Sequence, residues 1–172
     1  IREGRFTIKD YHPEKRPLTI PEIFMVSSNI GTAHMAQEVG TGNLKKAFHD
    51  FGLMTKPDFE IEEVGSPIIP NPWGEINTLT ASYGHGIAVT PLQLVGAVGM
   101  IVNGGVRVQP SLVMRDKEGK KSDSGIRVIS KETSLKMRQL MRLVVSNGTA
   151  RKANVAGYNI EIGRASCRER VS

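Results

Sequence analysis

The chain has 172 residues, of which 39% are hydrophobic, so it can bury one core and is expected to form one domain or a large part of one. Its longest apolar stretch, residues 92–102, is well short of the roughly 20 residues that a membrane-spanning helix needs. The net charge is +6, but lysine and arginine are distributed among acidic residues and no basic run alternates with aromatic residues. This pattern argues against nucleic acid as a partner.

Two helices are predicted in the first forty residues. In the first, over residues 18–25, Thr19 is a favoured cap residue and Glu22 stands three positions later, the spacing of a capping box. A second helix is expected over residues 30–39 and is followed by a glycine. The polar triplet Ser27-Ser28-Asn29 is therefore expected at the junction between two helices.

The middle of the chain alternates between helical and irregular patterns. An amphipathic helix is predicted over residues 43–51, whose apolar stripe consists of Leu44, Ala47, Phe48 and Phe51. Residues 55–78 carry a proline or glycine every few positions and are expected to form a long ordered loop region. Thr90 and Gln93 form a second capping-box pattern around Pro91, which predicts a buried helix over residues 91–102.

The C-terminal part is predicted to contain two strands and a helix. Residues 106–115 have the pattern of an edge strand broken by Pro110, and residues 116–125 that of an exposed charged turn. Ser130 is expected to cap the last helix, whose inner stripe consists of Met137, Leu140, Met141 and Val144. Residues 155–160 resemble the beginning of a further strand.

The last twelve residues, 161–172, differ in character from the rest. They carry five charges and the only cysteine, Cys167, and they resemble the translated read-through of a DNA-sequencing adapter. We therefore expect residues 1–160 to be the native part, which then has no disulfide, thiol nucleophile or zinc–thiolate site. The alternative is an exposed basic terminus with a reactive Cys167. A genomic read across codon 161 distinguishes the two.

Few residues stand out as carriers of chemistry. Ser27-Ser28-Asn29 alone is a weak signal, because serine and asparagine are the favoured caps of any helix. The four histidines, His12, His34, His49 and His85, show no metal-ligand spacing. The glycines around His85 do not form a nucleotide-binding loop and instead indicate a tight turn. Neither a metal nor another cofactor is predicted.

Five segments, taken in order, resemble the transpeptidase domain of class B penicillin-binding proteins. They are LTIPEIFMVSSNIGTAHMA (18–36), FGL (51–53), TASYGHGIAVTPLQL (80–94), IVNGG (101–105) and NGTARKANVAGY (147–158). The resemblance covers nearly all of residues 1–160, and within the family it is greatest to the division-specific septal enzyme. It implies an α/β (α+β) fold of the serine β-lactamase/transpeptidase type, represented mostly by its helical part and a few strands.

The resemblance implies roles for the triplet. Enzymes of this family combine S-x-x-K, which holds the nucleophile, with S-x-N and K-[ST]-G. Ser27 and Asn29 match the S-x-N motif: Ser27 is implied to relay a proton, and Asn29 to orient the donor peptide or a β-lactam. Ser28 is the variable middle residue and an implied substrate contact. Tyr83 and His85 are also implied substrate contacts, although relatives often have an aromatic residue in place of His85.

The other two motifs are absent from the sequence. No S-x-x-K or K-[ST]-G occurs, so the nucleophile and its lysine are expected before Ile1 and the K-T-G strand after Ile160. The chain by itself is therefore expected to be inactive. Because a central strand and the nucleophile helix would then be lacking, apolar faces would be left uncovered and the isolated chain is expected to be poorly soluble.

The resemblance also implies a setting. The substrate would be peptidoglycan stem peptide ending in D-Ala-D-Ala, with β-lactams as inhibitors and no cofactor. The partners would be divisome membrane proteins and a glycosyltransferase, with the domain at the periplasmic face of the bacterial inner membrane. Two other classes stay open: an elongation-type transpeptidase, β-lactamase or β-lactam sensor of the same fold, or a non-catalytic interaction domain whose triplet is only a helix cap.

Overall fold

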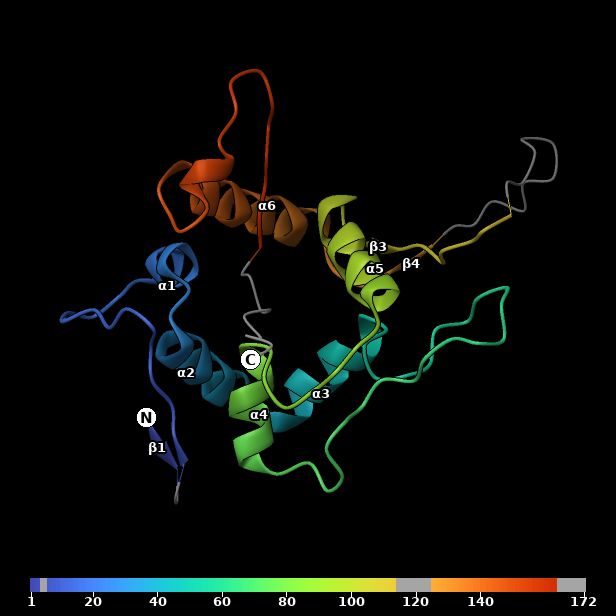
Figure 1. Ribbon diagram of the computed structural model, residues 1–172, viewed down its shortest axis with the longest axis horizontal. Helices are drawn as coiled ribbons and strands as arrows, with labels where there is room; N and C mark the ends of the chain where they lie inside the picture. Colours follow the sequence, from blue (N-terminus) through green and yellow to red (C-terminus); the bar gives the residue numbers. More distant parts are fainter. Residues whose placement is uncertain (4–5, 114–124, 164–172) are drawn as a thin grey trace. The chain divides into compact units, whose positions relative to one another are not determined.

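The computed structural model describes residues 1–3, 6–113 and 125–163. Its elements, labelled in Figure 1, are mainly helices with a few two-residue strands, which agrees with the expected α+β class. They are β1 (Arg2–Glu3), β2 (Phe6–Thr7), α1 (Ile20–Val26), α2 (Asn29–Val39), α3 (Thr41–Asp50), α4 (Glu75–Ser82), α5 (Pro91–Val102), β3 (Val106–Arg107), β4 (Ile126–Arg127), α6 (Lys131–Ser146) and the 3-10 helix η2 (Arg151–Ala153).

The chain forms two compact units. The first consists of Ile1–Leu44, Pro70–Gly86 and Arg138–Ser172, and the second of Lys45–Ile69 and Ile87–Met137. Helices α3 and α6 each begin in one unit and end in the other.

In the first unit, helix α1 begins after Thr19 as the sequence predicts, with the Glu22 half of the capping box formed and no hydrogen bond from the helix to the Thr19 hydroxyl. The Glu22 carboxylate accepts hydrogen bonds from the backbone N–H of Thr19 at 2.8 Å and from its hydroxyl at 2.9 Å. It also accepts a bond from the Arg16 guanidinium at 2.8 Å. These bonds stabilise the ionised carboxylate, so the pKa of Glu22 falls from 4.5 to about 2, with the Arg16 bond as the largest cause and the two Thr19 bonds next.

This lowered pKa makes the start of α1 sensitive to acid. Because the folded-state pKa lies below the unfolded one, the stabilisation is fully present above pH 4.5 and is lost as the pH falls toward 2. We expect Glu22→Gln to lower the urea midpoint at neutral pH, with the difference from the unmutated chain shrinking through that window. The control is Glu75→Gln, whose carboxylate has no ion-pair partner among the described residues. A difference that is independent of pH would contradict the prediction.

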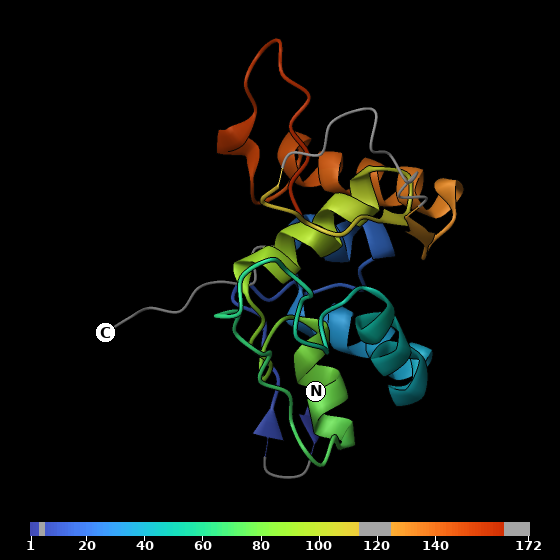
Figure 2. The same ribbon diagram turned by 90° about the vertical axis from the view of Figure 1, so that its right-hand side faces the viewer.

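The core of the first unit lies between α2 and α4, which pack side by side (Figures 1 and 2). Ala33 of α2 and Leu79 of α4 are fully buried, and Ile8, just after β2, packs with them at 5% exposure. The small Ala33 side chain lets the two helices approach closely. Tyr83, which follows α4, covers this cluster from the edge.

A buried hydroxyl of α4, that of Thr78, contacts the start of α3 and the segment before α4. The Thr78 hydroxyl is paired with the Thr41 hydroxyl at 2.9 Å and accepts a bond from the Trp73 indole N–H, also at 2.9 Å. Since an unpaired buried hydroxyl is costly, this network fixes the segment before α4 against the start of α3.

Helix α4 corrects the prediction that residues 55–78 are entirely a loop. The helix begins at Glu75, and the Asn77 side chain accepts a hydrogen bond from the Gly74 N–H at 2.8 Å. With eight residues directly after three closely spaced prolines, α4 is too short to show a helical period in the sequence.

In the second unit, α5 has the predicted capping box. The Gln93 N–H donates to the Thr90 hydroxyl at 3.2 Å, and the Thr90 N–H donates to the Gln93 side-chain oxygen at 3.0 Å. The Gln93 side-chain amide then donates to the carbonyls of Gly52 and Thr55 at 2.9 and 3.0 Å. A single buried side chain therefore caps α5 and holds the loop after α3.

Gln93→Leu is expected to lower the free energy of unfolding by about 1–3 kcal/mol, because it leaves several partially buried polar groups unpaired. The control is Gln109→Leu, an exposed glutamine whose amide bonds Asp58, for which a change within about 0.5 kcal/mol is expected. Urea denaturation of the chain measures both. Equal midpoints for the two variants would contradict the buried role of Gln93.

The strand predicted over residues 106–115 is shorter in the structure. Only β3 pairs, in antiparallel register with β4. Beyond it, the Leu112 N–H donates to the Glu60 carboxylate at 3.1 Å instead of to a neighbouring strand, and Pro110 has no N–H to donate. The charged turn predicted over 116–125 lies outside the described residues except for Gly125.

Helix α6 begins and is buried as predicted. The Ser130 hydroxyl accepts from the Thr133 N–H at 3.0 Å, and Met141 and Val144 of the predicted stripe are at 5% and 1% exposure. Residues 155–160, however, do not form a strand: they contain a turn and pair with no strand among the described residues. A strand needs a hydrogen-bonding neighbour, and none is present there.

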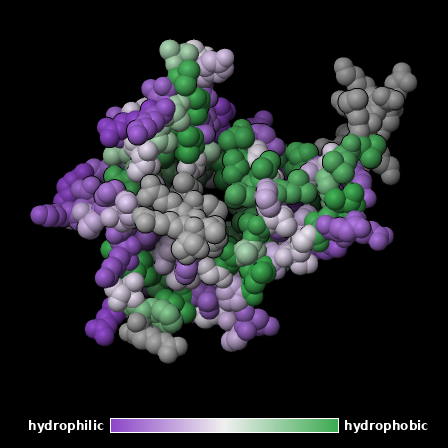
Figure 3. All heavy atoms as spheres, viewed as in Figure 1, coloured by the Kyte–Doolittle hydropathy of each residue, from purple (hydrophilic) through white to green (hydrophobic). Residues whose placement is uncertain are grey.

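Helix α5 presents an exposed apolar face in the second unit. Figure 3 shows apolar side chains gathered over this helix. The exposed apolar residues of α5 include Leu94, Val95 and Val98, of which Val95 is 68% exposed.

Within the described ranges, no helix combines the length and apolarity needed to cross a membrane.

This apolar face supports the predicted poor solubility of the isolated chain. We expect Val95→Lys to raise the concentration at which the chain stays in solution. The control is Gln139→Lys, which adds the same charge on the exposed side of α6 without covering apolar surface. Light scattering against protein concentration measures both variants. An equal rise in the soluble concentration of the two variants would show that the added charge, and not the covered apolar face, causes the effect.

Candidate active site

The triplet Ser27-Ser28-Asn29 lies at the helix junction, as predicted. Helix α1 ends at Val26, and Ser27 adopts left-handed backbone angles of φ 57° and ψ 46°. It is the only non-glycine residue with positive φ in the described part of the chain. A side chain in this region costs about 1–2 kcal/mol, so glycine is the usual residue here. Strain of this kind is often found at functional sites.

The Ser27 conformation is held by the end of α1. The Ser27 N–H donates to the carbonyl of Phe24 at 3.3 Å, and the Ser28 N–H donates to that of Ile23 at 3.1 Å. Ser27 itself is half-buried, and its hydroxyl makes no hydrogen bond with any of the described residues. This hydroxyl is therefore available to a substrate or to groups that lie outside the chain.

Ser28 has a structural position. It is 4% exposed and is the N-cap of α2: its hydroxyl accepts from the Gly31 N–H at 2.9 Å and donates to the Asp10 carboxylate at 2.8 Å. The capping interpretation of the triplet therefore holds for Ser28. Its implied role as a substrate contact stays a prediction, and its burial makes it the least accessible residue of the three.

Asn29 is the first residue of α2 and is half-buried. Its side-chain amide donates to the carbonyl of Lys9 at 2.8 Å. This bond fixes the plane of the amide group, so that its oxygen and nitrogen are presented in one orientation.

A second segment contacts the junction from the side of α1. The Thr149 N–H donates to the carbonyl of Met25 at 3.1 Å, and Gly148 lies so close that a Cβ there would be 2.5 Å from the same oxygen. The NGT turn after α6 thus requires glycine and packs against the last turn of α1, two residues before Ser27.

Tyr83 and His85 form a pair beyond the end of α4. Their rings stack with centroids 6.4 Å apart and an interplanar angle of 17°. His85 is exposed between two glycines of positive φ. Its backbone N–H donates to the carbonyl of Thr80 at 3.0 Å. The triplet and this pair thus belong to the same unit, the triplet at the start of α2 and the pair after α4.

Lys9 and Asp10 were not singled out from the sequence. They lie 17 or more residues before the triplet, and no local spacing links them to it. Gly148 was not singled out either, although its place in the NGTARKANVAGY segment was an available signal.

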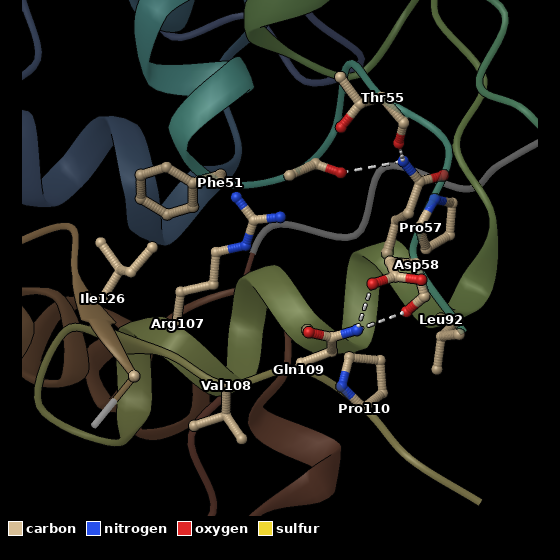
Figure 4. A pocket seen from close by; sticks show the side chains of 14 residues that line it. Phe51, Thr55, Pro57, Asp58, Leu92, Arg107, Val108, Gln109, Pro110 and Ile126 are labelled. Atoms are coloured by element: carbon tan, nitrogen blue, oxygen red, sulfur yellow. Dashed lines mark hydrogen bonds between the residues drawn. The ribbon is translucent and has the colours of Figure 1, made fainter. Parts of the chain in front are cut away.

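The second unit contains an open cavity of about 450 Å³, shown in Figure 4. Phe51, Leu92 and Val108 form part of its wall; the Gln109 amide donates to the Asp58 carboxylate at 2.9 Å at one side, and Arg107 extends toward Phe51. None of the predicted site residues lines it. Across the described ranges, no group of three or more histidine, cysteine or acidic residues could hold a metal ion.

Comparison with known proteins identifies the class. The family described as "Penicillin binding protein transpeptidase domain" matches residues 2–162. The chain therefore belongs to the transpeptidase domain family of class B penicillin-binding proteins.

The chain is also similar to individual curated proteins of greater length. The chain is 36% identical over 160 residues to "Probable peptidoglycan D,D-transpeptidase FtsI" of Caulobacter vibrioides, covering 91% of this chain and 27% of that protein. It is 33% identical over 152 residues to "Stage V sporulation protein D" of Bacillus subtilis, covering 83% and 24%. The chain thus spans about a quarter of the length of these relatives.

Solved structures agree on the fold. The transpeptidase domain of Burkholderia pseudomallei penicillin-binding protein 3 superposes with a TM-score of 0.76 at 27% identity, over 84% of this chain and 44% of that one. Penicillin-binding protein 3 of Mycobacterium tuberculosis, in complex with ampicillin, gives 0.75 at 28% identity, over 87% and 36%. The predicted transpeptidase-like fold is confirmed.

Proposed function

We propose that the complete protein is a septal peptidoglycan D,D-transpeptidase that cross-links stem peptides through a serine acyl-enzyme. The observation that carries this proposal is the strained Ser27, whose hydroxyl is left without a partner among the described residues while both of its polar neighbours are anchored. A helix that ends in this conformation usually has glycine at this position, so the serine keeps a hydroxyl here at a steric cost. Family membership supplies the reaction class.

In this proposal Ser27 relays a proton. The nucleophilic serine and its lysine belong to the S-x-x-K motif, which does not occur in these 172 residues. The Ser27 hydroxyl can accept a proton and donate another, and so links that lysine to the leaving amine. Asn29, fixed by Lys9, orients the donor peptide. The chain alone, without the other two motifs, forms no acyl-enzyme.

The substrate contacts and the setting are part of the same proposal. The stacked pair Tyr83 and His85 contacts the substrate, a stem peptide ending in D-Ala-D-Ala or a β-lactam that mimics it, and Ser28 supports the contact from within the turn. No cofactor is required. The domain works at the periplasmic face of the inner membrane with divisome proteins and a glycosyltransferase, a setting supported by the description of the Caulobacter relative as a probable peptidoglycan D,D-transpeptidase.

Covalent labelling by fluorescent penicillin tests the reaction class. The gene is extended in both directions to the full reading frame, and the purified protein is incubated with the probe and separated under denaturing conditions. A stable labelled band is expected. Rapid turnover of the probe would instead indicate a β-lactamase, and absence of any labelling would favour a non-catalytic interaction domain.

Complementation tests the septal assignment. The full-length gene is expressed in a conditional mutant of the division transpeptidase, and restored septation is expected. Rescue of an elongation mutant without rescue of septation would refute the septal role and leave the transpeptidase class intact.

A further inference from the structure

The carboxylate of Asp10 connects two groups of the triplet region. One oxygen accepts from the Ser28 hydroxyl at 2.8 Å, and the other accepts from the backbone N–H of Ile30 at 2.9 Å. The preceding residue, Lys9, offers its carbonyl to the Asn29 amide at 2.8 Å. Two consecutive residues thus contact the triplet and the first turn of α2 through three hydrogen bonds.

The position of Asp10 is fixed by the core. Ile8, two residues before it, is 5% exposed and packs with Ala33 of α2 and Leu79 of α4. The Ile8 N–H also donates to the carbonyl of Ile1 at 2.8 Å. A short arm of two residues therefore leads from a buried anchor to the carboxylate, which leaves Asp10 little freedom to move relative to α2.

The chemistry of the Asp10 carboxylate suits it to fix the start of α2. A carboxylate at the first turn of a helix is favoured by the partial positive charge of the unpaired N–H groups, and hydrogen bonds to an ionised acceptor are stronger than neutral ones. With the Ser28 hydroxyl donating to Asp10, its lone pair is left for the Gly31 N–H, which it accepts at 2.9 Å. The direction of each hydrogen bond in the turn is thereby determined.

The contacts of Asp10 also affect the position of Ser27. The end of α1 holds one side of Ser27, and Ser28, bound to Asp10, holds the other. A strained backbone persists only where the surroundings determine it, and these two contacts do so. Resting on the function proposed above, we infer that Asp10 is a positioning residue: it fixes Ser28 and the start of α2 so that Ser27 and Asn29 keep the geometry that acylation requires.

The test uses Asp10→Asn in the full-length protein. An asparagine keeps an acceptor for the Ile30 N–H, but it replaces the acceptor of the Ser28 hydroxyl with an NH₂ group. We expect the first-order acylation rate with fluorescent penicillin to fall by about 10- to 100-fold, while the dissociation constant of the non-covalent complex stays within about two-fold. Stopped-flow labelling over a range of probe concentrations separates the two constants.

Two controls separate positioning from general stability. Lys15→Ala removes an exposed side chain from the same segment that makes no contact with the triplet, and its acylation rate is expected to be unchanged. Gln93→Leu destabilises the second unit and is likewise expected to leave the acylation rate within about two-fold. If Gln93→Leu and Asp10→Asn, compared at similar loss of stability, lower the rate equally, the role of Asp10 is merely structural.

A double-mutant cycle assigns the effect to the right contact. In a Ser28→Ala background, Asp10→Asn is expected to change the acylation rate much less, because the hydroxyl that it positions is gone. An undiminished effect would overturn the proposed path through Ser28. Labelling of the unmutated protein with an unchanged rate in Asp10→Asn overturns the role of Asp10 alone, whereas absence of labelling in the unmutated protein overturns the proposed function and this role with it.

Discussion

Ser27→Ala in the full-length protein is expected to lower the acylation rate with fluorescent penicillin by about 10²- to 10⁴-fold, the range typical of a lost proton-transfer group. The substitution keeps the Cβ and removes a hydroxyl that has no partner among the described residues. Little change in stability is therefore expected, within about 0.5 kcal/mol. Rate and stability are measured on the same protein preparation by stopped-flow labelling and thermal denaturation.

Ser27→Gly is the matched variant, because it separates backbone strain from chemistry. Glycine adopts φ 57° without steric cost, so stability is expected to be equal to or higher than that of the unmutated protein by up to about 1 kcal/mol. The acylation rate is nevertheless expected to fall as far as in Ser27→Ala. If either variant is labelled at the unmutated rate, the proton-relay role of Ser27 is wrong and the residue serves only to end α1.

The predictions that held depend on local chemistry. Glu22 binds the Thr19 N–H, and Thr90 and Gln93 bind each other's N–H groups, each within three residues, so these bonds can be predicted from a few letters of sequence. Ser130 caps α6 for the same reason.

The predictions that failed depend on partners distant in sequence. Helix α4 is stabilised by the Thr78 contacts to Trp73 and Thr41, and the latter lies 37 residues away. The strand expected beyond Arg107 does not continue, because Glu60, more than 50 residues earlier, binds the backbone of that segment. Neither contact could be inferred from spacing alone.

The candidate site shows the same division. Its motif was recognisable in the sequence, but the different structural positions of Ser27 and Ser28 were not. Ser28 is anchored by Asp10, which lies 18 residues before it. The positive φ of Ser27 could not be predicted either, because serine has no preference for that conformation.

The contact between the NGT turn and α1 leads to a second large effect. Gly148→Ala is expected to lower the free energy of unfolding by about 1–3 kcal/mol, because the new Cβ would lie 2.5 Å from the carbonyl oxygen of Met25 and 2.8 Å from that of Val144. Both obstacles are backbone atoms, so no side-chain rotation relieves them. Gly42→Ala in α3 is the control: nothing lies within 4 Å of its Cβ position, and a gain of about 0.5–1 kcal/mol is expected.

Gly148→Ala is also expected to disturb the backbone around Ser27 in the candidate active site. Relief of the clash moves the NGT turn away from α1 and weakens the 3.1 Å bond from the Thr149 N–H to Met25, which lies two residues before the strained Ser27. The acylation rate of the full-length protein should therefore fall together with stability. Hydrogen exchange at the Thr149 amide reports the contact directly. Loss of stability with unchanged exchange at Thr149 would show that the strain is absorbed within α6 and does not reach Ser27.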